Sequence, residues 1–172
     1  MDGQGRVIRL AEKLCPIAGT VRIRKGSADS PASATGGFVL RNLSDLLGVP
    51  FIDGGRDPKS GLDCYGLFSV VCSRFGNDIP DVIVSAFDTL RINEMVNMEK
   101  GTWGKMDKPA PGCAILFSTD PNYPDLISHL GVYVGGGKFI HTLEKTGVIL
   151  SSLEDYYWKN KAKGFYGWIS PS

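Results

Sequence analysis

The stretch DCYGLFSVVCSRFG, residues 63–76, predicts the helix around which the rest of the domain is arranged. Its apolar side chains recur at helical spacing, at Cys64, Leu67, Phe68, Val71 and Phe75. Asp63 is a preferred N-cap residue type, and Gly76 is the residue type that most often ends a helix. This places Cys64 in the first helical turn, where the backbone N–H groups and the helix dipole favour a thiolate.

The carboxylate of Asp63 acts on Cys64 in the opposite direction, because a neighbouring negative charge raises the pKa of a thiol. We therefore expect the Asp63 side chain to turn away, either into the helix cap or toward a substrate. A free cysteine is also among the most buried residue types. Taken alone, Cys64 is more often a structural thiol, and the choice depends on whether the chain supplies a base.

Composition narrows the class of protein. Of the 172 residues 42% are hydrophobic and 22% charged, which suits one globular domain. The formal net charge of +1 lacks the basic footprint of a nucleic-acid binder. Four cysteines without a pairing rhythm argue against a disulfide framework. We expect no signal peptide at the N-terminus, which has no apolar core, and no membrane span, because no apolar run is long enough.

Residues 1–41 differ from the rest of the chain in composition and in the density of periodic hydrophobic patterns. They end in the run GSADSPASATGG, residues 26–37, whose glycine, serine, alanine and proline content is typical of a flexible linker. From Asn42 onward, periodic signals are dense. We therefore predict an N-terminal arm and linker over residues 1–41, followed by a single domain over residues 42–172.

The domain has its predicted helices first and its strands afterwards. Residues 42–49 predict a short helix with Asn42 or Ser44 as N-cap, and residues 84–99 predict another. Short strands separated by turn residues follow, over residues 111–118, 128–134, 138–142 and 147–153, with one more over residues 165–170. This order is typical of an α+β domain whose N-terminal helices pack on a central antiparallel sheet.

The segment SHLGVYVGGGKFIHT, residues 128–142, predicts a β-hairpin that turns at three consecutive glycines. With a three-residue loop, Val134 pairs with Lys138. This register puts the two histidines of the chain, His129 and His141, on one face of the sheet, about 7–8 Å apart at the backbone. A two-residue loop would place them on opposite faces, so the inference depends on register.

The residues around this histidine pair also follow from the predicted register. Gly131 lies opposite His141, which leaves room beside the two rings. The other face of the hairpin collects apolar side chains and is the predicted core face, with Leu130, Val132, Val134 and Ile140.

A cysteine on a helix and two histidines on one sheet face meet the requirements of a cysteine nucleophile. His129 is the candidate base that takes the thiol proton and returns it to the leaving amine, and His141 is the candidate group that orients it. The backbone N–H of Cys64 and its neighbours at the helix terminus are candidate oxyanion donors. We expect no metal or cofactor, because Cys64 and Cys72 lie about 12 Å apart along the helix and there is no other close ligand pair.

Four motifs in this order resemble the NlpC-type, papain-like cysteine peptidases of bacterial cell walls: GLDCYGL, PGCAILF, HLGVYVGGGKFIHT and GVILSSLEDYYW. The resemblance covers roughly residues 43–170. It implies the papain-like NlpC-type fold, a catalytic Cys64, the base His129 and the third polar residue His141. It also implies an endopeptidase acting on peptidoglycan stem peptides, commonly between γ-D-glutamate and diaminopimelate or lysine.

Within that family, residues 51–67 are most similar to the versions found in phage tails and prophage regions, which lack signal peptides. This similarity implies phage tail proteins as partners beside the peptidoglycan stem peptide. It also implies synthesis in the cytoplasm, followed by association with a virion or release by lysis.

Two residues depart from the family pattern. Tyr65 stands where a small serine usually lines the substrate pocket, and Cys113 stands where an aspartate usually follows Pro-Gly. Asp63 and Tyr65 are the expected substrate-binding residues, and Tyr65 leaves the choice of substrate open. Two alternatives therefore stand beside the peptidase: a non-catalytic wall-binding or tail module, and a thiol amidase or acyltransferase. Residues 156–158 suit a substrate groove or, more often, core and rim packing.

Overall fold

The computed structural model describes residue 37, residues 39–98 and residues 103–168. Most of the predicted N-terminal arm therefore lies outside the described residues. Among the described helices, none combines the length and the apolar character that crossing a bilayer requires.

The domain begins with a helical segment over residues 39–43 that continues into the 3-10 helix η1 (Ser44–Leu46). Its apolar stripe is fully buried and consists of Val39, Leu43 and Leu46. The predicted N-cap at Asn42 or Ser44 is wrong, because the helix starts earlier; the Ser44 hydroxyl instead donates to the Arg41 carbonyl at 3.0 Å. Val39, which belongs to the predicted arm, is thus part of the packed core.

The region predicted as a long loop contains a small hairpin, β1 (Arg56–Asp57) and β2 (Gly61–Leu62). It leads into helix α3 (Cys64–Arg74). The predicted apolar face of this helix is confirmed, since Leu67, Phe68 and Val71 are fully buried. Gly76 ends the helix with a positive φ of 82°, as predicted.

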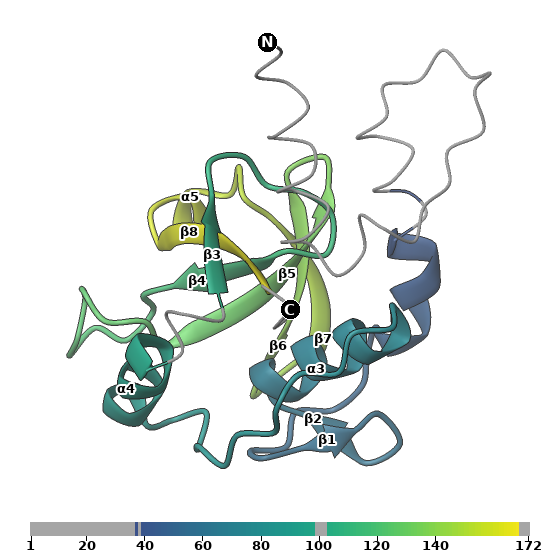
Figure 1. Cartoon of the computed structure of the whole chain (residues 1–172), viewed down its shortest axis with the longest axis horizontal. Helices are drawn as coiled ribbons and strands as arrows, with labels where there is room; N and C mark the ends of the chain where they lie inside the picture. The colour runs from purple at the N-terminus through teal and green to yellow at the C-terminus, as the bar shows by residue number, and fades with distance from the viewer. Residues whose placement is uncertain (1–36, 38, 99–102, 169–172) are drawn as a thin grey trace, which may run out of the picture.

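Beyond α3 the chain has no helix or strand until helix α4 (Thr89–Met98), and it makes a turn at residues 86–87. The helix predicted over residues 84–99 thus starts five residues late. Asp88 accounts for the start, because its carboxylate accepts the backbone N–H of Arg91 at 3.1 Å in the manner of an N-cap. In Figure 1 this connection runs along the bottom of the molecule, from α3 to α4.

The other strands form one antiparallel sheet of six, in the order β3-β8-β4-β5-β6-β7. The strands are β3 (Trp103–Met106), β4 (Ala114–Phe117), β5 (His129–Gly135), β6 (Lys138–Leu143), β7 (Gly147–Ser152) and β8 (Ala162–Trp168), and a short helix α5 (Tyr156–Lys159) precedes β8. The tail strand therefore lies inside the sheet, between β3 and β4. The predicted α+β class is confirmed, and β3 and α5 are additions that the sequence patterns did not predict.

The two faces of the sheet carry different layers. Helix α3 contacts β5 and β6 on one face, where Val132 and Ile140 join the helix core. On the other face Phe117 and Phe139 form a second cluster with Trp158 of α5. Figure 1 shows α3 at the lower side of the sheet and α5 at its upper left.

The β5–β6 hairpin reaches the predicted register by a different route. Gly135 pairs with Lys138, so the loop has two residues, Gly136 and Gly137, both with the positive φ that a type I′ turn requires. The predicted pairing of Val134 with Lys138 is therefore wrong. A bulge adds one residue between Tyr133 and Gly135, and it restores the pairing of Val132 with Ile140. The two histidines consequently share a face after all.

Candidate active site

Asp63 caps the helix that begins with Cys64. Its Oδ1 accepts the backbone N–H of Gly66 at 2.7 Å and a guanidinium N–H of Arg56 at 2.8 Å. Its Oδ2 accepts the backbone N–H of Gly54 at 2.9 Å. The side chain is 1% exposed, and both oxygens are engaged by the fold. Of the two roles expected for Asp63, the structure shows the cap.

Gly66 explains why the helix can begin against this loop. A Cβ at position 66 would lie 1.9 Å from the carbonyl oxygen of Gly55. Only glycine therefore lets the first turn of α3 approach the β1 strand so closely. This contact fixes Cys64 relative to the residues that hold the Asp63 carboxylate.

Cys64 as a residue is half-buried, and it borders the cavity beside Leu130 of β5. Burial, followed by the Asp63 carboxylate, raises the pKa of the thiol to about 12. Backbone N–H groups, among them that of Leu130, hydrogen-bond the sulfur and lower its pKa, but they do not outweigh the first two effects. Of the opposing effects at Cys64, burial and the Asp63 carboxylate therefore outweigh the N–H groups of the helix terminus, and the pKa of the thiol stays above its ordinary value.

The two histidines are directly hydrogen-bonded, a contact that the predicted register allows. His129 Nε2 and His141 Nδ1 lie 2.9 Å apart. The remaining ring nitrogen of His141, Nε2, lies 2.8 Å from the hydroxyl oxygen of Ser151 on β7. His129 thus has only Nδ1 left for contact with Cys64, and His141 is fully buried behind it.

Aromatic rings enclose the histidine pair, and the sequence patterns did not assign them to the site. The Trp158 ring stacks on His129 at 5.7 Å between centroids and meets His141 edge-on at 4.6 Å. Phe139 packs on His141 at 4.7 Å. The room predicted beside Gly131 is not empty, because the Phe139 ring lies 2.7 Å from where a Cβ of residue 131 would be. Of the two roles considered for residues 156–158, Trp158 therefore has the packing role.

This enclosure keeps both imidazoles neutral. Burial lowers the pKa of His129 to about 4. Burial, followed by the proximity of His129, lowers the pKa of His141 to about 3. At neutral pH both imidazoles are therefore uncharged, and His129 is in the form that accepts a proton.

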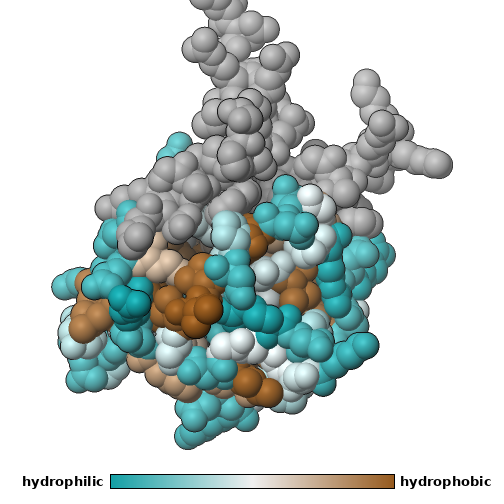
Figure 2. All heavy atoms as spheres, turned by 60° about the horizontal axis from the view of Figure 1, so that its bottom comes forward, coloured by the Kyte–Doolittle hydropathy of each residue, from teal (hydrophilic) through white to brown (hydrophobic). Residues whose placement is uncertain are grey.

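Cys64 and His129 line the same cavity, which has a volume of about 50 Å³. Asp63 and Tyr65 also border it, whereas His141 does not. The rest of the lining is largely apolar and includes Val82, Val84, Ala86, Ile92, Met95, Val96, Leu116, Ile127 and Leu130. Figure 2 turns the bottom of Figure 1 toward the viewer. On this face apolar side chains reach the surface among polar ones.

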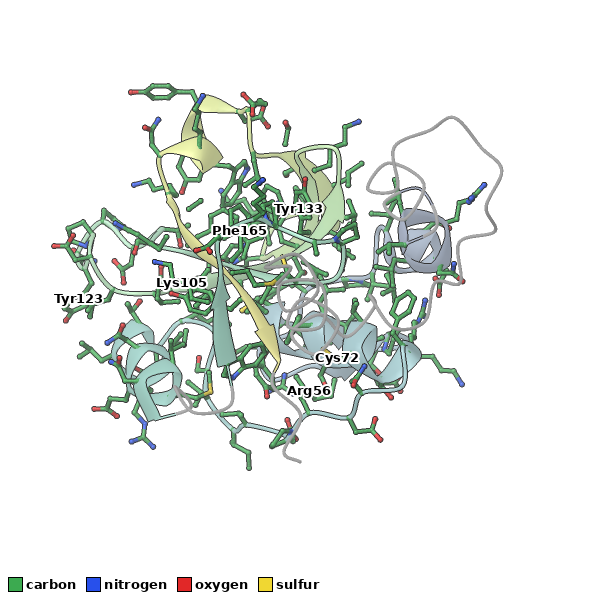
Figure 3. The ribbon with its side chains drawn as sticks, turned by 45° about the horizontal axis from the view of Figure 1, so that its top comes forward. Arg56, Cys72, Lys105, Tyr123, Tyr133 and Phe165 are labelled. Atoms are coloured by element: carbon green, nitrogen blue, oxygen red, sulfur yellow. The ribbon has the colours of Figure 1, made fainter. Side chains whose placement is uncertain are left out.

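The segment over residues 81–87, which ends in a turn, closes one side of this cavity and is hydrogen-bonded near both of its ends. Arg56 donates to the Asp81 carboxylate at 2.8 Å and to the Val82 carbonyl at 2.7 Å. The Asp53 carboxylate accepts the backbone N–H of Ala86 at 2.6 Å. In Figure 3 Arg56 lies below α3, on the side of this segment. One guanidinium therefore joins the helix cap to the cavity wall.

Tyr65 occupies the rim of the cavity in a fixed position. Its hydroxyl donates to the Pro80 carbonyl at 2.5 Å, and the Arg56 guanidinium lies over its ring at 5.3 Å. The large side chain is thus part of the wall beside the cysteine. In the part of the chain that the structure describes, no group of three or more His, Cys, Asp or Glu side chains is placed to hold a metal ion.

A cysteine at a helix N-terminus thus shares a cavity with a histidine that is hydrogen-bonded to a second histidine, an arrangement that suits a cysteine nucleophile. The NlpC/P60 family model matches residues 48–166, and this chain belongs to the NlpC/P60 family.

Relatives with assigned names include three hydrolases. The chain is 31% identical over 164 residues to gamma-DL-glutamyl hydrolase of Bacillus subtilis, covering 95% of this chain and 36% of the relative. It is 31% identical to the probable peptidoglycan endopeptidase LytE of Bacillus subtilis, covering 73% and 32%. It is 26% identical to murein DD-endopeptidase MepS/murein LD-carboxypeptidase of Escherichia coli, covering 72% and 57%. The matched part of the chain thus spans between 32% and 57% of the length of these relatives.

Solved structures support the fold. A lipoprotein-like NLP/P60 family protein of Staphylococcus aureus superposes with a TM-score of 0.57 at 19% identity, over 90% of this chain and 48% of that one. NlpC1 of Trichomonas vaginalis superposes with a TM-score of 0.56 at 21% identity, over 84% and 48%. The predicted papain-like NlpC-type fold is confirmed.

Proposed function

We propose that this protein is a cysteine peptidase that hydrolyses peptide bonds in the stem peptides of bacterial peptidoglycan. The observation that carries the proposal is the shared cavity of Cys64 and His129, with His129 hydrogen-bonded to His141. Family membership and the hydrolase names of the three relatives support it.

In the proposed reaction His129 Nδ1 removes the Cys64 proton as the sulfur attacks the substrate carbonyl. A neutral thiol and a neutral imidazole suit this coupled transfer, because the charges appear only as the new bond forms. The backbone N–H of Cys64 and neighbouring donors at the helix terminus stabilise the oxyanion. His129 then gives the proton to the leaving amine, which leaves a thioester on Cys64. Water, deprotonated by His129, hydrolyses the thioester and releases the acid.

For the bond, we propose the γ-D-glutamyl linkage to diaminopimelate or lysine. The motif resemblance supports this choice, and so does the relative named gamma-DL-glutamyl hydrolase, to which 95% of the chain aligns. We also propose that the protein associates with phage tails, and that it leaves the cell either as part of the virion or when the cell lyses. The resemblance of residues 51–67 to phage-tail versions of the family supports this proposal.

The deciding experiment is digestion of purified peptidoglycan by the chain and by its Cys64→Ala variant. We expect the wild-type protein to release new amino termini, and mass spectrometry of the products to place the cleavage after D-glutamate. Cys64→Ala should release none while keeping its far-UV circular dichroism spectrum. The matched control is Cys113→Ala, which removes a buried thiol that does not line the cavity. Full activity of Cys64→Ala would refute the assignment.

One observation favours a second candidate, a thiol amidase or acyltransferase. The cavity wall is largely apolar, and the bulky Tyr65 stands on its rim. Such a wall suits an apolar acyl group better than a charged stem peptide. Comparing kcat/KM on defined stem peptides with that on simple amides and acyl esters separates the two functions.

A further inference from the structure

The hydrogen-bond chain that starts at His129 continues beyond the second histidine. Strand β7 pairs with β6 so that Ile149 lies opposite His141 and Ser151 lies opposite Phe139. Ser151 is therefore a diagonal neighbour of His141 on the same sheet face, within side-chain reach. Its hydroxyl oxygen lies 2.8 Å from His141 Nε2. Three side chains from three consecutive strands thus form one continuous line.

The protons along this line are coupled, because each neutral imidazole carries only one N–H. A single proton lies between His129 Nε2 and His141 Nδ1. If His129 supplies it, His129 Nδ1 is bare and can act as a base toward Cys64. His141 must then carry its own proton on Nε2, and that N–H needs an acceptor. If His141 supplies the shared proton instead, His129 carries a proton on Nδ1 and cannot take another from Cys64.

We propose that Ser151 is a positioning residue: its hydroxyl oxygen accepts the Nε2–H of His141 and thereby holds His129 in the tautomer whose Nδ1 is bare. Its effect on turnover rests on the proposed peptidase function, whereas its effect on the tautomers does not. Ser151 touches neither Cys64 nor the cavity and acts through His141 alone.

A serine hydroxyl can also donate, to a bare Nε2 of His141, so the surroundings of the pair bear on which role Ser151 takes. His141 is packed between His129 on β5, Trp158 on α5 and Phe139 on its own strand. Of these neighbours His129 is the one that titrates, and it lowers the pKa of His141. Across the cavity His129 faces Cys64 and, beyond it, the carboxylate of Asp63, which is engaged in the helix cap. The aromatic rings offer no acceptor, so the Ser151 oxygen is the group that can hold the His141 proton on Nε2.

Three substitutions separate this role from simple packing. Ser151→Ala removes the acceptor, Ser151→Thr keeps a hydroxyl, and Ser151→Asp supplies a permanent acceptor with a negative charge. The matched control is Ser152→Ala, because Ser152 is the next residue on β7 and its hydroxyl accepts only the local backbone N–H of Glu154, at 3.2 Å. Nitrogen-15 NMR of the two imidazoles reports directly which ring nitrogens carry a proton, and kcat/KM across pH reports the consequence.

In the wild-type protein, in Ser151→Thr and in Ser152→Ala we expect a bare Nδ1 on His129. In Ser151→Ala we expect the His129 Nδ1 signal to shift toward the protonated value and kcat to fall about three- to tenfold, the factor associated with one net hydrogen bond. Ser151→Asp should move the acid limb of the kcat/KM profile up by about one pH unit, because a carboxylate stabilises the imidazolium.

A Ser151→Ala protein with a bare Nδ1 on His129 and a wild-type rate would overturn the inference. If that variant does not fold, an unmoved acid limb in Ser151→Asp would overturn it equally. The failure of the proposed function looks different: Cys64→Ala would then remain active, while the nitrogen-15 signals of the Ser151 variants would still report the tautomers.

Discussion

Charged and polar groups hold the chain around Cys64, whereas aromatic rings hold it around His129 and His141. On the cysteine side, the Asp63 carboxylate is buried against backbone N–H groups and the guanidinium of Arg56. On the histidine side, Trp158 and the phenylalanines of β4 and β6 pack on the imidazoles. Different interactions therefore position the reactive group on each side: ionic and backbone hydrogen bonds at Cys64, and aromatic packing at His129.

The difference has a chemical consequence. A buried carboxylate beside Cys64 stabilises the protonated thiol, and an aromatic enclosure stabilises the neutral imidazole. Both sides thus oppose charge in the resting site. On the polar side, a substitution that removes one partner leaves a buried charge unpaired, which is costly. We expect substitutions on the histidine side to affect turnover first, and those on the cysteine side to affect folding first.

The largest expected effect is on turnover. His129→Gln keeps a side chain of similar size that can still hydrogen-bond His141, but it removes the base. We expect kcat/KM on peptidoglycan fragments to fall by about 100- to 10,000-fold. The free energy of unfolding, measured by urea denaturation, should change by less than about 1 kcal/mol. A large loss of stability with retained turnover would contradict the expectation that substitutions on the histidine side affect turnover before folding.

The corresponding change on the cysteine side is Arg56→Ala. It leaves the Asp63 carboxylate, 1% exposed, without its charged partner and frees the segment that begins at Asp81. We expect the free energy of unfolding to fall by about 3 kcal/mol. Arg56→Lys is the control: it keeps the charge but loses the fork that reaches Asp63, Asp81 and Val82 together, so its loss should be smaller but measurable.

Acid should weaken the histidine side. The pKa values of His129 and His141 in the folded chain, about 4 and about 3, lie below the ordinary value of 6.5. As the pH falls below about 6.5 the unfolded chain takes up protons that the folded chain does not. This contribution to stability is therefore complete above pH 6.5 and is lost progressively down to about pH 4 for His129 and about pH 3 for His141. Urea denaturation at several pH values measures it; in a His129→Gln, His141→Gln double variant the slope between pH 6.5 and 4 should be reduced.

The smallest effect is expected at the exposed ion pair between Arg74 of α3 and Asp45 of η1. The guanidinium donates two hydrogen bonds of 2.6 Å to the carboxylate, and the Asp45 side chain is 63% exposed. We expect Asp45→Ala to cost about 0.5 kcal/mol or less, and to cost nothing measurable at high salt. The loss in Arg56→Ala should persist at high salt, because that pair is shielded from solvent. Equal losses would contradict the contrast drawn between a buried and an exposed pair.

Much of the site was predictable because its geometry depends on short-range periodicity. The spacing of Leu67, Phe68 and Val71 predicted α3, and the Asp63 cap placed Cys64 at its first turn. The hairpin prediction also placed both histidines on one face, although the assumed pairing of Val134 was wrong. A shorter turn and a one-residue bulge cancel each other in the register, and local sequence does not distinguish that pair of changes from a longer loop.

Other features could not be predicted, because they join residues that no short pattern connects. Trp158 and Ser151 reach the histidines only because β7 pairs with β6 and the short helix α5 packs against the sheet. Arg56 reaches Asp63 and Asp81 from either side because the β1–β2 hairpin lies beside α3.

By itself the sequence determined which residues could react and which elements carry them, since helical spacing, the Asp63 cap and the glycine turn are local preferences of the backbone. Only the tertiary structure decided the protonation of those residues. The pKa values of Cys64, His129 and His141 depend on burial and on neighbouring charge, and both arise when distant segments pack around the site.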